Sequence, residues 1–243
     1  MYQRPTYLPA GDRALSVEFG NAISPDISSR VRAFYMAVEA RDLPGVLELV
    51  PTYRAILVYY DPLVVAYSDL VDRLESLEAA QAAAPPSAPS VVEIPTVYGG
   101  EYGPDLEHVS RHCGLPQDEV VRIHAGTDYL IYMMGFTPGF PYLGGMSERI
   151  ATPRLQTPRT IIPAGSVGIA EKQTGVYPIE SPGGWQLIGR TPVRLFDPGR
   201  DPPVIVEAGD YLRFVPVTED TFRQLERQVE SGPYQPVVRA AGE

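Results

Sequence analysis

Cysteine is almost absent from this chain of 243 residues, since Cys113 is the only one. An internal disulfide is therefore excluded, as expected of a protein in a reducing compartment. No apolar run approaches the roughly 18 residues that a membrane-spanning helix needs. The first twenty residues also lack the basic flank and apolar core of a secretion signal. These absences predict a cytoplasmic protein that has no membrane partner.

Basic residues are also scarce, with 20 Lys and Arg against 30 Asp and Glu and a formal net charge of −10. A surface of this sign repels phosphate backbones, so nucleic acid is not expected as a partner. Neither the phosphate-binding G-x-x-x-x-G-K-[ST] motif nor the dinucleotide G-x-G-x-x-G motif occurs after a strand. The G-x-S-x-G nucleophile motif is missing as well. The residues alone therefore predict no complete catalytic apparatus.

Histidine occurs three times. His108 and His112 lie four residues apart on a predicted helix, a spacing that suits two metal ligands. No acidic residue stands between them in the metalloprotease pattern and no further Cys or His pair exists, so a solvated helix face is the better interpretation and no metal site is predicted. His124 precedes the strand that enters the most glycine-rich segment. It is either a helix C-cap or a general base, and it is the main candidate for acid–base chemistry.

Glycine and proline are abundant, at 22 and 26 residues, and 44% of the chain is hydrophobic. Glycine and proline at this frequency interrupt regular secondary structure and favour short strands joined by turns. Residues 1–84 are predicted to form a two-layer α+β domain of the split βαβ type, in the order β-α-β-β-α. The strands are expected at 14–20, 46–50 and 55–60, and the helices at 24–40 and 68–80.

A proline-rich segment, residues 85–90, has little to bury and is interpreted as a linker. The remainder, 91–243, is predicted to be a mainly-β domain, either a small antiparallel barrel or a sandwich, that also contains two short helices before the buried strand "DYLIYMMGF". Residues 204–217 are expected to form a hairpin that turns at Ala208, Gly209 and Asp210. A capped helix is expected directly after it.

Two loop segments stand out in the second domain. "GFTPGFPYLGGM", Gly135 to Met146, contains four glycines, two prolines and three aromatic residues. Thr137-Pro138-Gly139 is predicted to form a turn in which glycine takes a positive φ. The aromatic residues then either close the end of the barrel or form the rim of a pocket.

The second segment is "EKQTGVYPIESPGGW", Glu171 to Trp185, which ends in the single tryptophan of the chain. Polar and aromatic side chains on loops between strands are typical of a pocket rim, and the alternative is a pair of solvated hairpin tips. The two interpretations have about equal support from the residues alone.

Five segments resemble one family over nearly the whole chain: "GDRALSVEFG", "GGEYGPDLEHV", "YMMGFTPGFPYLGGM", "TPRTIIPAGSVGIA" and "QTGVYPIESPGGWQLIGRTPVRLFDP". They are similar to the family that contains the B subunit of 5-oxoprolinase (PxpB), the kinase inhibitor KipI and allophanate hydrolase subunit 1 domains. The resemblance implies an α+β N-terminal domain followed by a cyclophilin-like β-barrel domain.

The function that this resemblance implies is that of the B subunit in an ATP-dependent 5-oxoprolinase, which hydrolyses 5-oxo-L-proline to L-glutamate. ATP with Mg would act at the level of the complex, and this chain alone would be inactive. The expected partners are a homologue of the C subunit (PxpC, similar to allophanate hydrolase subunit 2), encoded separately because the chain ends at Glu243, and the A subunit. The alternatives are a KipI-like inhibitor of a sensor histidine kinase and half of a urea- or allophanate-type biotin-dependent carboxyltransferase.

The resemblance also implies residues that bind substrate or face a partner, and two catalytic candidates are added to them. His124 is chosen from its place in the chain, and Lys172 as a cation that would stabilise an oxyanion. Many members of the family have glycine where this chain has Glu171, so Lys172 could instead be paired with a carboxylate. The residues expected to bind substrate or face a partner are Gly135, Phe136, Pro138, Gly139, Phe140, Tyr142, Gln173, Thr174, Gly175, Tyr177, Ser181, Gly183, Gly184 and Trp185.

Overall fold

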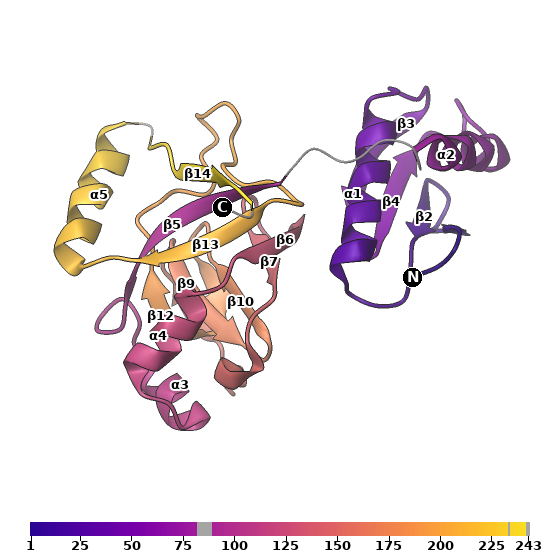
Figure 1. Ribbon diagram of the computed structural model, residues 1–243. Coiled ribbons are helices and arrows are strands. Elements are labelled where there is room, and N and C mark those ends of the chain that lie inside the picture. The colour runs from indigo at the N-terminus through magenta and orange to yellow at the C-terminus, as the bar shows by residue number, and fades with distance from the viewer. Residues whose placement is uncertain (82–88, 233, 242–243) are drawn as a thin grey trace. The chain divides into compact units, whose positions relative to one another are not determined.

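The computed structural model describes residues 1–81, 89–232 and 234–241. The chain divides into two compact units, 1–87 and 88–243 (Figure 1). Most of the predicted linker at 85–90 lies outside the described residues. Its last residue, Ser90, begins the first strand of the second unit.

The first unit contains one antiparallel sheet with the strand order β1-β2-β4-β3. Strands β2 and β3 each pair antiparallel with β4, so they run parallel to each other with β4 between them, as in a split βαβ unit. The elements are β1 (Thr6–Pro9), β2 (Ala14–Glu18), α1 (Pro25–Glu39), β3 (Val46–Pro51), β4 (Ala55–Tyr60) and α2 (Tyr67–Gln81). Strand β1 was not predicted, because its residues show little apolar alternation and are largely exposed.

Local chemistry explains where α1 begins and which face it buries. The Ser24 hydroxyl accepts a hydrogen bond from the Ile27 amide at 3.3 Å, and Pro25 occupies the first helical position. Buried residues recur at helical spacing, and α1 packs against β3, β4 and α2. This apolar stripe joins the core that the sheet and α2 complete.

The second unit is built on a sheet that is nearly closed. Its order is β10-β9-β12-β5-β13-β6-β7, with β14 also paired to β5, and the two end strands β10 and β7 lie against each other (Figure 1). The strands are β5 (Ser90–Tyr98), β6 (Tyr129–Met134), β7 (Pro141–Gly144), β9 (Ser166–Ala170), β10 (Gln173–Val176), β12 (Gln186–Arg190), β13 (Tyr211–Pro216) and β14 (Val237–Ala240). A separate two-stranded sheet pairs β8 (Arg159–Ile162) with β11 (Ser181–Gly183).

Three helices and a short 3-10 turn accompany this sheet. Helix α3 (Leu106–Cys113) contacts β12, and α4 (Gln117–Ala125) contacts β13. The 3-10 turn η1 (Glu148–Ile150) contacts both of these helices, and α5 (Glu219–Ser231) lies against β5. Helix α5 begins as predicted, with the Thr218 hydroxyl accepting from the Thr221 amide at 3.3 Å. In the described part of the chain, no helix combines the length and apolarity that crossing a bilayer requires.

The predicted hairpin over residues 204–217 is wrong. Only its second arm is a strand, β13, and this strand pairs parallel with β5 and antiparallel with β6. The first arm follows a different partner, since the Ile205 amide donates to the Leu195 carbonyl. A turn does form at Gly209. The Gly209 amide donates to the carbonyl of Ile131 in β6 at 2.7 Å, so the turn is bound to β6 and does not close a hairpin.

Candidate functional site

The first unusual segment is the loop that joins β6 to β7 and the β7 strand itself. The predicted turn is confirmed, since the Phe140 amide donates to the Thr137 carbonyl at 3.1 Å and Gly139 has a φ of 79°. A Cβ on Gly139 would also lie 2.7 Å from the Cβ of Phe196. The Gly135 amide closes the loop by donating to the Phe140 carbonyl. The amides of Gly135 and Phe140 are thus used within the loop, and its aromatic faces are what it offers to a ligand.

Phe140 is the centre of an aromatic cluster that the two predicted segments build together. Its ring is 4% exposed and lies 5.2 to 6.0 Å, centroid to centroid, from four other rings. All four contacts are edge-to-face, the geometry that the charge distribution of aromatic rings favours. The four rings belong to Phe136, Tyr142, Tyr177 and Trp185.

Glycines in the second segment make space for these rings. A Cβ on Gly175 would lie 3.1 Å from Cζ3 of Trp185, and a Cβ on Gly183 would lie 2.5 Å from the Tyr177 hydroxyl oxygen. These residues therefore face the aromatic cluster and are not the tips of solvated hairpins. Of the two interpretations of this segment, the geometry favours the pocket rim.

The cluster borders a pocket of about 460 Å³. Eight of the residues that the sequence predicted line it, and three lining residues were not predicted. The lining consists of Phe136, Phe140, Tyr142, Gln173, Tyr177, Gly183, Gly184 and Trp185, together with Arg154, Pro158 and Pro182. Gly135 and Gly175 lie against rings of the cluster, whereas Gly139 lies against Phe196.

A partly buried ion pair fixes the backbone on one side of this pocket. Arg159 pairs with Asp105 at 2.8 Å and also donates to the Trp185 carbonyl at 3.2 Å. The Asp105 carboxylate accepts a second hydrogen bond, from the Leu187 amide at 2.6 Å. Because both neighbours of Gln186 are held in this way, the start of β12 and the position of the tryptophan are well defined.

Arg154 is a pocket residue that the sequence did not reveal, and among the residues that the structure describes it is the only charged one in the lining. A signal for it exists in "TPRLQTPR", Thr152 to Arg159, where the triplet Thr-Pro-Arg occurs twice. The second arginine is the structural Arg159. Burial raises the pKa of Tyr177, while the positive charges of Arg154 and Arg159 act in the opposite direction.

Phe136 differs from the other rings because it is 64% exposed and has a φ of 61°. A positive φ is rare for a large side chain and costs roughly 1 to 3 kcal/mol. An exposed aromatic ring held in an unfavourable backbone conformation is more typical of a contact residue than of a core residue. The ring still touches Phe140, so it forms the outer edge of the aromatic cluster.

His124 does not reach the pocket, which argues against its predicted acid–base role. The ring is fully buried, with Nε2 2.7 Å from the Thr174 hydroxyl oxygen and Nδ1 2.8 Å from the Tyr98 hydroxyl oxygen. The Thr174 hydroxyl donates to the Gly168 carbonyl, so it accepts from Nε2–H, and Nδ1 accepts from Tyr98. Burial lowers the pKa of His124 to about 3. It is a neutral core histidine near neutral pH.

Lys172 also lies outside the pocket lining. Its Nζ is 2.6 Å from the Glu148 carboxylate, and both side chains are exposed. A catalytic role would require this pair to break. Among the other predicted residues, Pro138 and Ser181 do not line the pocket either, and Thr174 is buried against His124.

Glu171 has a φ of 53°, which explains why glycine suits this position. Replacing Glu171 with Gly should raise the free energy of unfolding by roughly 0.5 to 1 kcal/mol, because glycine adopts this conformation without steric cost. Urea denaturation followed by the fluorescence of Trp185 measures this change. The control is Lys172→Gly, one residue later and outside the positive-φ region, which should lower stability by a similar amount. Destabilisation by both substitutions would contradict the explanation.

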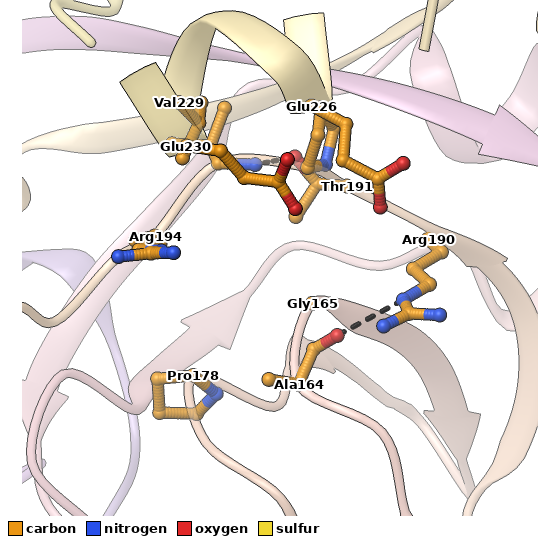
Figure 2. A pocket seen from close by; sticks show the side chains of 11 residues that line it. Ala164, Gly165, Pro178, Arg190, Thr191, Arg194, Glu226, Val229 and Glu230 are labelled. Carbon is orange, nitrogen blue, oxygen red and sulfur yellow. Dashed lines mark hydrogen bonds between the residues drawn. The ribbon is translucent and has the colours of Figure 1, made fainter. Parts of the chain in front are cut away.

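A second, smaller pocket of about 190 Å³ lies between α5 and the barrel. Figure 2 shows Glu226 and Glu230 projecting from α5 on one side, with Arg190 and Arg194 on the other. Arg190 donates to the Ala164 carbonyl at 3.0 Å. None of the predicted site residues lines this pocket, and it has no aromatic wall, so the larger pocket is the candidate site.

The larger pocket does not suit a nucleoside triphosphate with its metal. The described residues of its lining include one cation and no carboxylate, whereas Mg²⁺ is normally held by carboxylates and substrate phosphates. Within residues 1–81, 89–232 and 234–241, no group of three or more His, Cys, Asp or Glu residues could hold a metal ion. The pocket instead presents an aromatic wall beside one guanidinium group.

Comparison with known proteins places these features in a family. Residues 5–206 match the carboxyltransferase domain, subdomain C and D. The chain is 43% identical to the B subunit of 5-oxoprolinase from Bacillus subtilis (strain 168), over 87% of this chain and 92% of that protein. It is 26% identical to urea amidolyase of Lachancea kluyveri, over 94% of this chain but only 14% of that protein. The crystal structure of TTHA0988 superimposes with a TM-score of 0.76 at 35% identity, over 85% of this chain and 40% of that one.

Proposed function

The chain belongs to the family of carboxyltransferase domains, subdomain C and D, and we propose that it is the B subunit of an ATP-dependent 5-oxoprolinase. The complex would hydrolyse 5-oxo-L-proline to L-glutamate together with a separate C subunit. The observation that carries the proposal is the 43% identity to a protein of that name over nearly the full length of both chains. The same membership and the nearly closed sheet support a cyclophilin-like barrel for residues 91–243, after an α+β domain at 1–84.

The pocket suits a small lactam. The five-membered ring of 5-oxoproline has an apolar edge that can pack on the aromatic cluster, and such walls provide most of the contact area in small-molecule sites. The loop around Pro138 and Gly139 is fixed by its own hydrogen bonds, so little conformational entropy is lost when a ligand binds. This chain would thus bind and orient the ring and exclude water from one of its faces.

The ATP-dependent step is assigned to another member of the complex. Amide resonance makes lactam opening difficult, and phosphorylation of the carbonyl oxygen would create a group that water can displace. The pocket lining that the structure describes contains neither carboxylates for Mg²⁺ nor several cations for a triphosphate. The chain is therefore proposed to be inactive alone, with ATP and Mg acting at the level of the complex.

The C subunit is proposed to meet this chain at the outer edge of the pocket. Phe136 is the most exposed of the clustered rings, and aromatic residues are enriched where proteins make stable contacts. The three rings of the first segment then have different roles. Phe140 supports the core, Tyr142 lines the pocket, and Phe136 faces the partner.

The similarity to urea amidolyase supports one alternative, half of a biotin-dependent carboxyltransferase. The lower identity and the small share of that protein that is covered make this alternative weaker. The two functions require different co-reactants, so one reconstitution separates them.

The test is to purify this chain with its candidate C and A subunits and to measure ADP release with 5-oxo-L-proline. We expect release that depends on 5-oxo-L-proline and that falls to background when this chain is omitted. An unchanged rate without this chain would contradict the proposal. Carboxylation that requires an added biotin carrier protein, with no response to 5-oxo-L-proline, would establish the alternative.

A further inference from the structure

Arg154 has an unused positive charge inside the candidate site. It is exposed, it is the only charged residue in the pocket lining, and it makes no ion pair with any residue that the structure describes. Arg159, from the same repeated triplet, already uses its guanidinium group to bind Asp105 and the Trp185 carbonyl. Of the two arginines beside the aromatic cluster, Arg154 is therefore the one with its hydrogen-bond donors open to a ligand.

The backbone around Arg154 is fixed on both sides. The Pro153 carbonyl accepts from the Gln186 side-chain amide at 2.8 Å, and the Leu155 amide donates to the Gly184 carbonyl at 2.7 Å. Just before this segment, Thr152 and Glu171 exchange two backbone hydrogen bonds. The backbone of Arg154 therefore has a defined position at the rim of the pocket, and this anchors the side chain beside the aromatic cluster.

An anionic ligand needs a positively charged group close to its binding site in this acidic protein. With a formal net charge of −10, the chain repels anionic ligands at long range. A single guanidinium group beside an aromatic wall favours a small molecule that has an apolar ring and one carboxylate, because guanidinium and carboxylate form paired hydrogen bonds. A neutral urea-like ligand would leave this charge without a partner.

We propose that Arg154 binds the carboxylate of 5-oxo-L-proline and thereby selects carboxylated lactams over neutral ones. This inference rests on the proposed 5-oxoprolinase function and adds a specificity residue to it. The aromatic cluster would then contact the ring, while Arg154 fixes its orientation through the carboxylate. The lactam carbonyl would be directed away from Arg154, toward the surface that the partner protein completes.

The test uses steady-state kinetics of the reconstituted complex. Arg154→Gln should raise the KM for 5-oxo-L-proline by about 10- to 100-fold and change kcat much less, since a hydrogen-bonded charge partner is lost in both the ground and the transition state. Arg154→Lys should give an intermediate KM, because the charge stays but the paired geometry is lost. The matched control is Arg194→Gln, an exposed arginine at the second pocket (Figure 2), which should leave KM unchanged.

A neutral analogue shows what Arg154 recognises. 5-Oxo-L-prolinamide, in which an amide replaces the carboxylate, should inhibit the wild-type complex and the Arg154→Gln complex equally weakly. Stronger inhibition of the wild type would show that the arginine acts on the ring and would overturn the inference. An unchanged KM in Arg154→Gln, or a fall in kcat alone, would overturn it as well. A wild-type complex with no response to 5-oxo-L-proline would instead refute the proposed function.

Discussion

Replacing His124 with alanine should lower the free energy of unfolding of the barrel unit at pH 7 by about 3 to 5 kcal/mol. The substitution leaves a cavity beside Tyr129 and Phe214, whose ring centroids lie 5.5 and 4.6 Å from the imidazole centroid. It also removes a hydrogen-bond partner from Tyr98 and from Thr174. Urea denaturation followed by Trp185 fluorescence reports on this unit, because Trp185 is the only tryptophan of the chain.

The same histidine predicts how stability depends on pH. Its pKa is about 3 in the folded protein, against an ordinary value of 6.5 in the unfolded chain. Above pH 6.5 both states are neutral and the full stability is present. As the pH falls from 6.5 toward 3, only the unfolded chain takes up the proton, so stability falls by about 1.4 kcal/mol per pH unit. The wild type and His124→Ala differ in their free energy of unfolding, and this difference should therefore decrease by about 2 kcal/mol as the pH falls from 6.5 to 5.

The matched control for the loss of the buried ring is His112→Ala, because His112 is an exposed histidine on α3. This substitution should change the free energy of unfolding at pH 7 by less than about 0.5 kcal/mol. If His124→Ala unfolds with the wild-type stability at pH 7, the ring is not the packed and hydrogen-bonded core residue described above. If the free energies of unfolding of the wild type and His124→Ala differ by the same amount at pH 7 and at pH 5, the lowered pKa of His124 is contradicted.

Replacing Phe140 with alanine should have a comparable effect on stability and should also remove the pocket. The ring is 4% exposed and contacts four aromatic neighbours, and truncating such a residue costs about 3 to 5 kcal/mol. Because Trp185 and Tyr177 pack on this ring, the wall of the site should lose its shape. We expect a lower urea midpoint and loss of 5-oxo-L-proline-dependent ADP release in the reconstituted complex.

Phe136→Ala is the matched control in the same loop. Its ring is 64% exposed, so the free energy of unfolding should change by less than about 0.5 kcal/mol. Affinity for the C subunit should nevertheless fall, because the exposed ring is proposed to face that partner. Equal losses of stability in the two alanine variants would contradict the distinction between a core ring and a contact ring.

The elements set by local sequence could be predicted, and those set by distant pairing could not. The first unit follows from short-range periodicity and from the Ser24 cap, so its order of strands and helices was predicted apart from β1. In the second unit, residues 204–217 look like a hairpin in sequence, but β13 finds its partners in β5 and β6. Nothing within a local window distinguishes these two pairings.

The candidate site shows the same division. The density of glycine and aromatic residues identified both loops, because ordinary strands and single turns do not require such a composition. The burial of His124 could not be predicted, since its partners Tyr98 and Thr174 come from strands that are remote in sequence. Arg154 could have been identified from the repeated Thr-Pro-Arg triplet, but which of its two arginines is free depends on Asp105.

Strand β5 has a consequence for how the protein is made. It pairs with β12, β13 and β14, whose residues extend to Ala240. During translation, β5 is therefore synthesised long before any of these three partner strands. Strand pairs that are so far apart in sequence form slowly. During synthesis the edges of β5 stay open to other chains, which is the situation in which aggregation competes with folding. The first unit, whose strands pair with near neighbours in sequence, can fold during this interval.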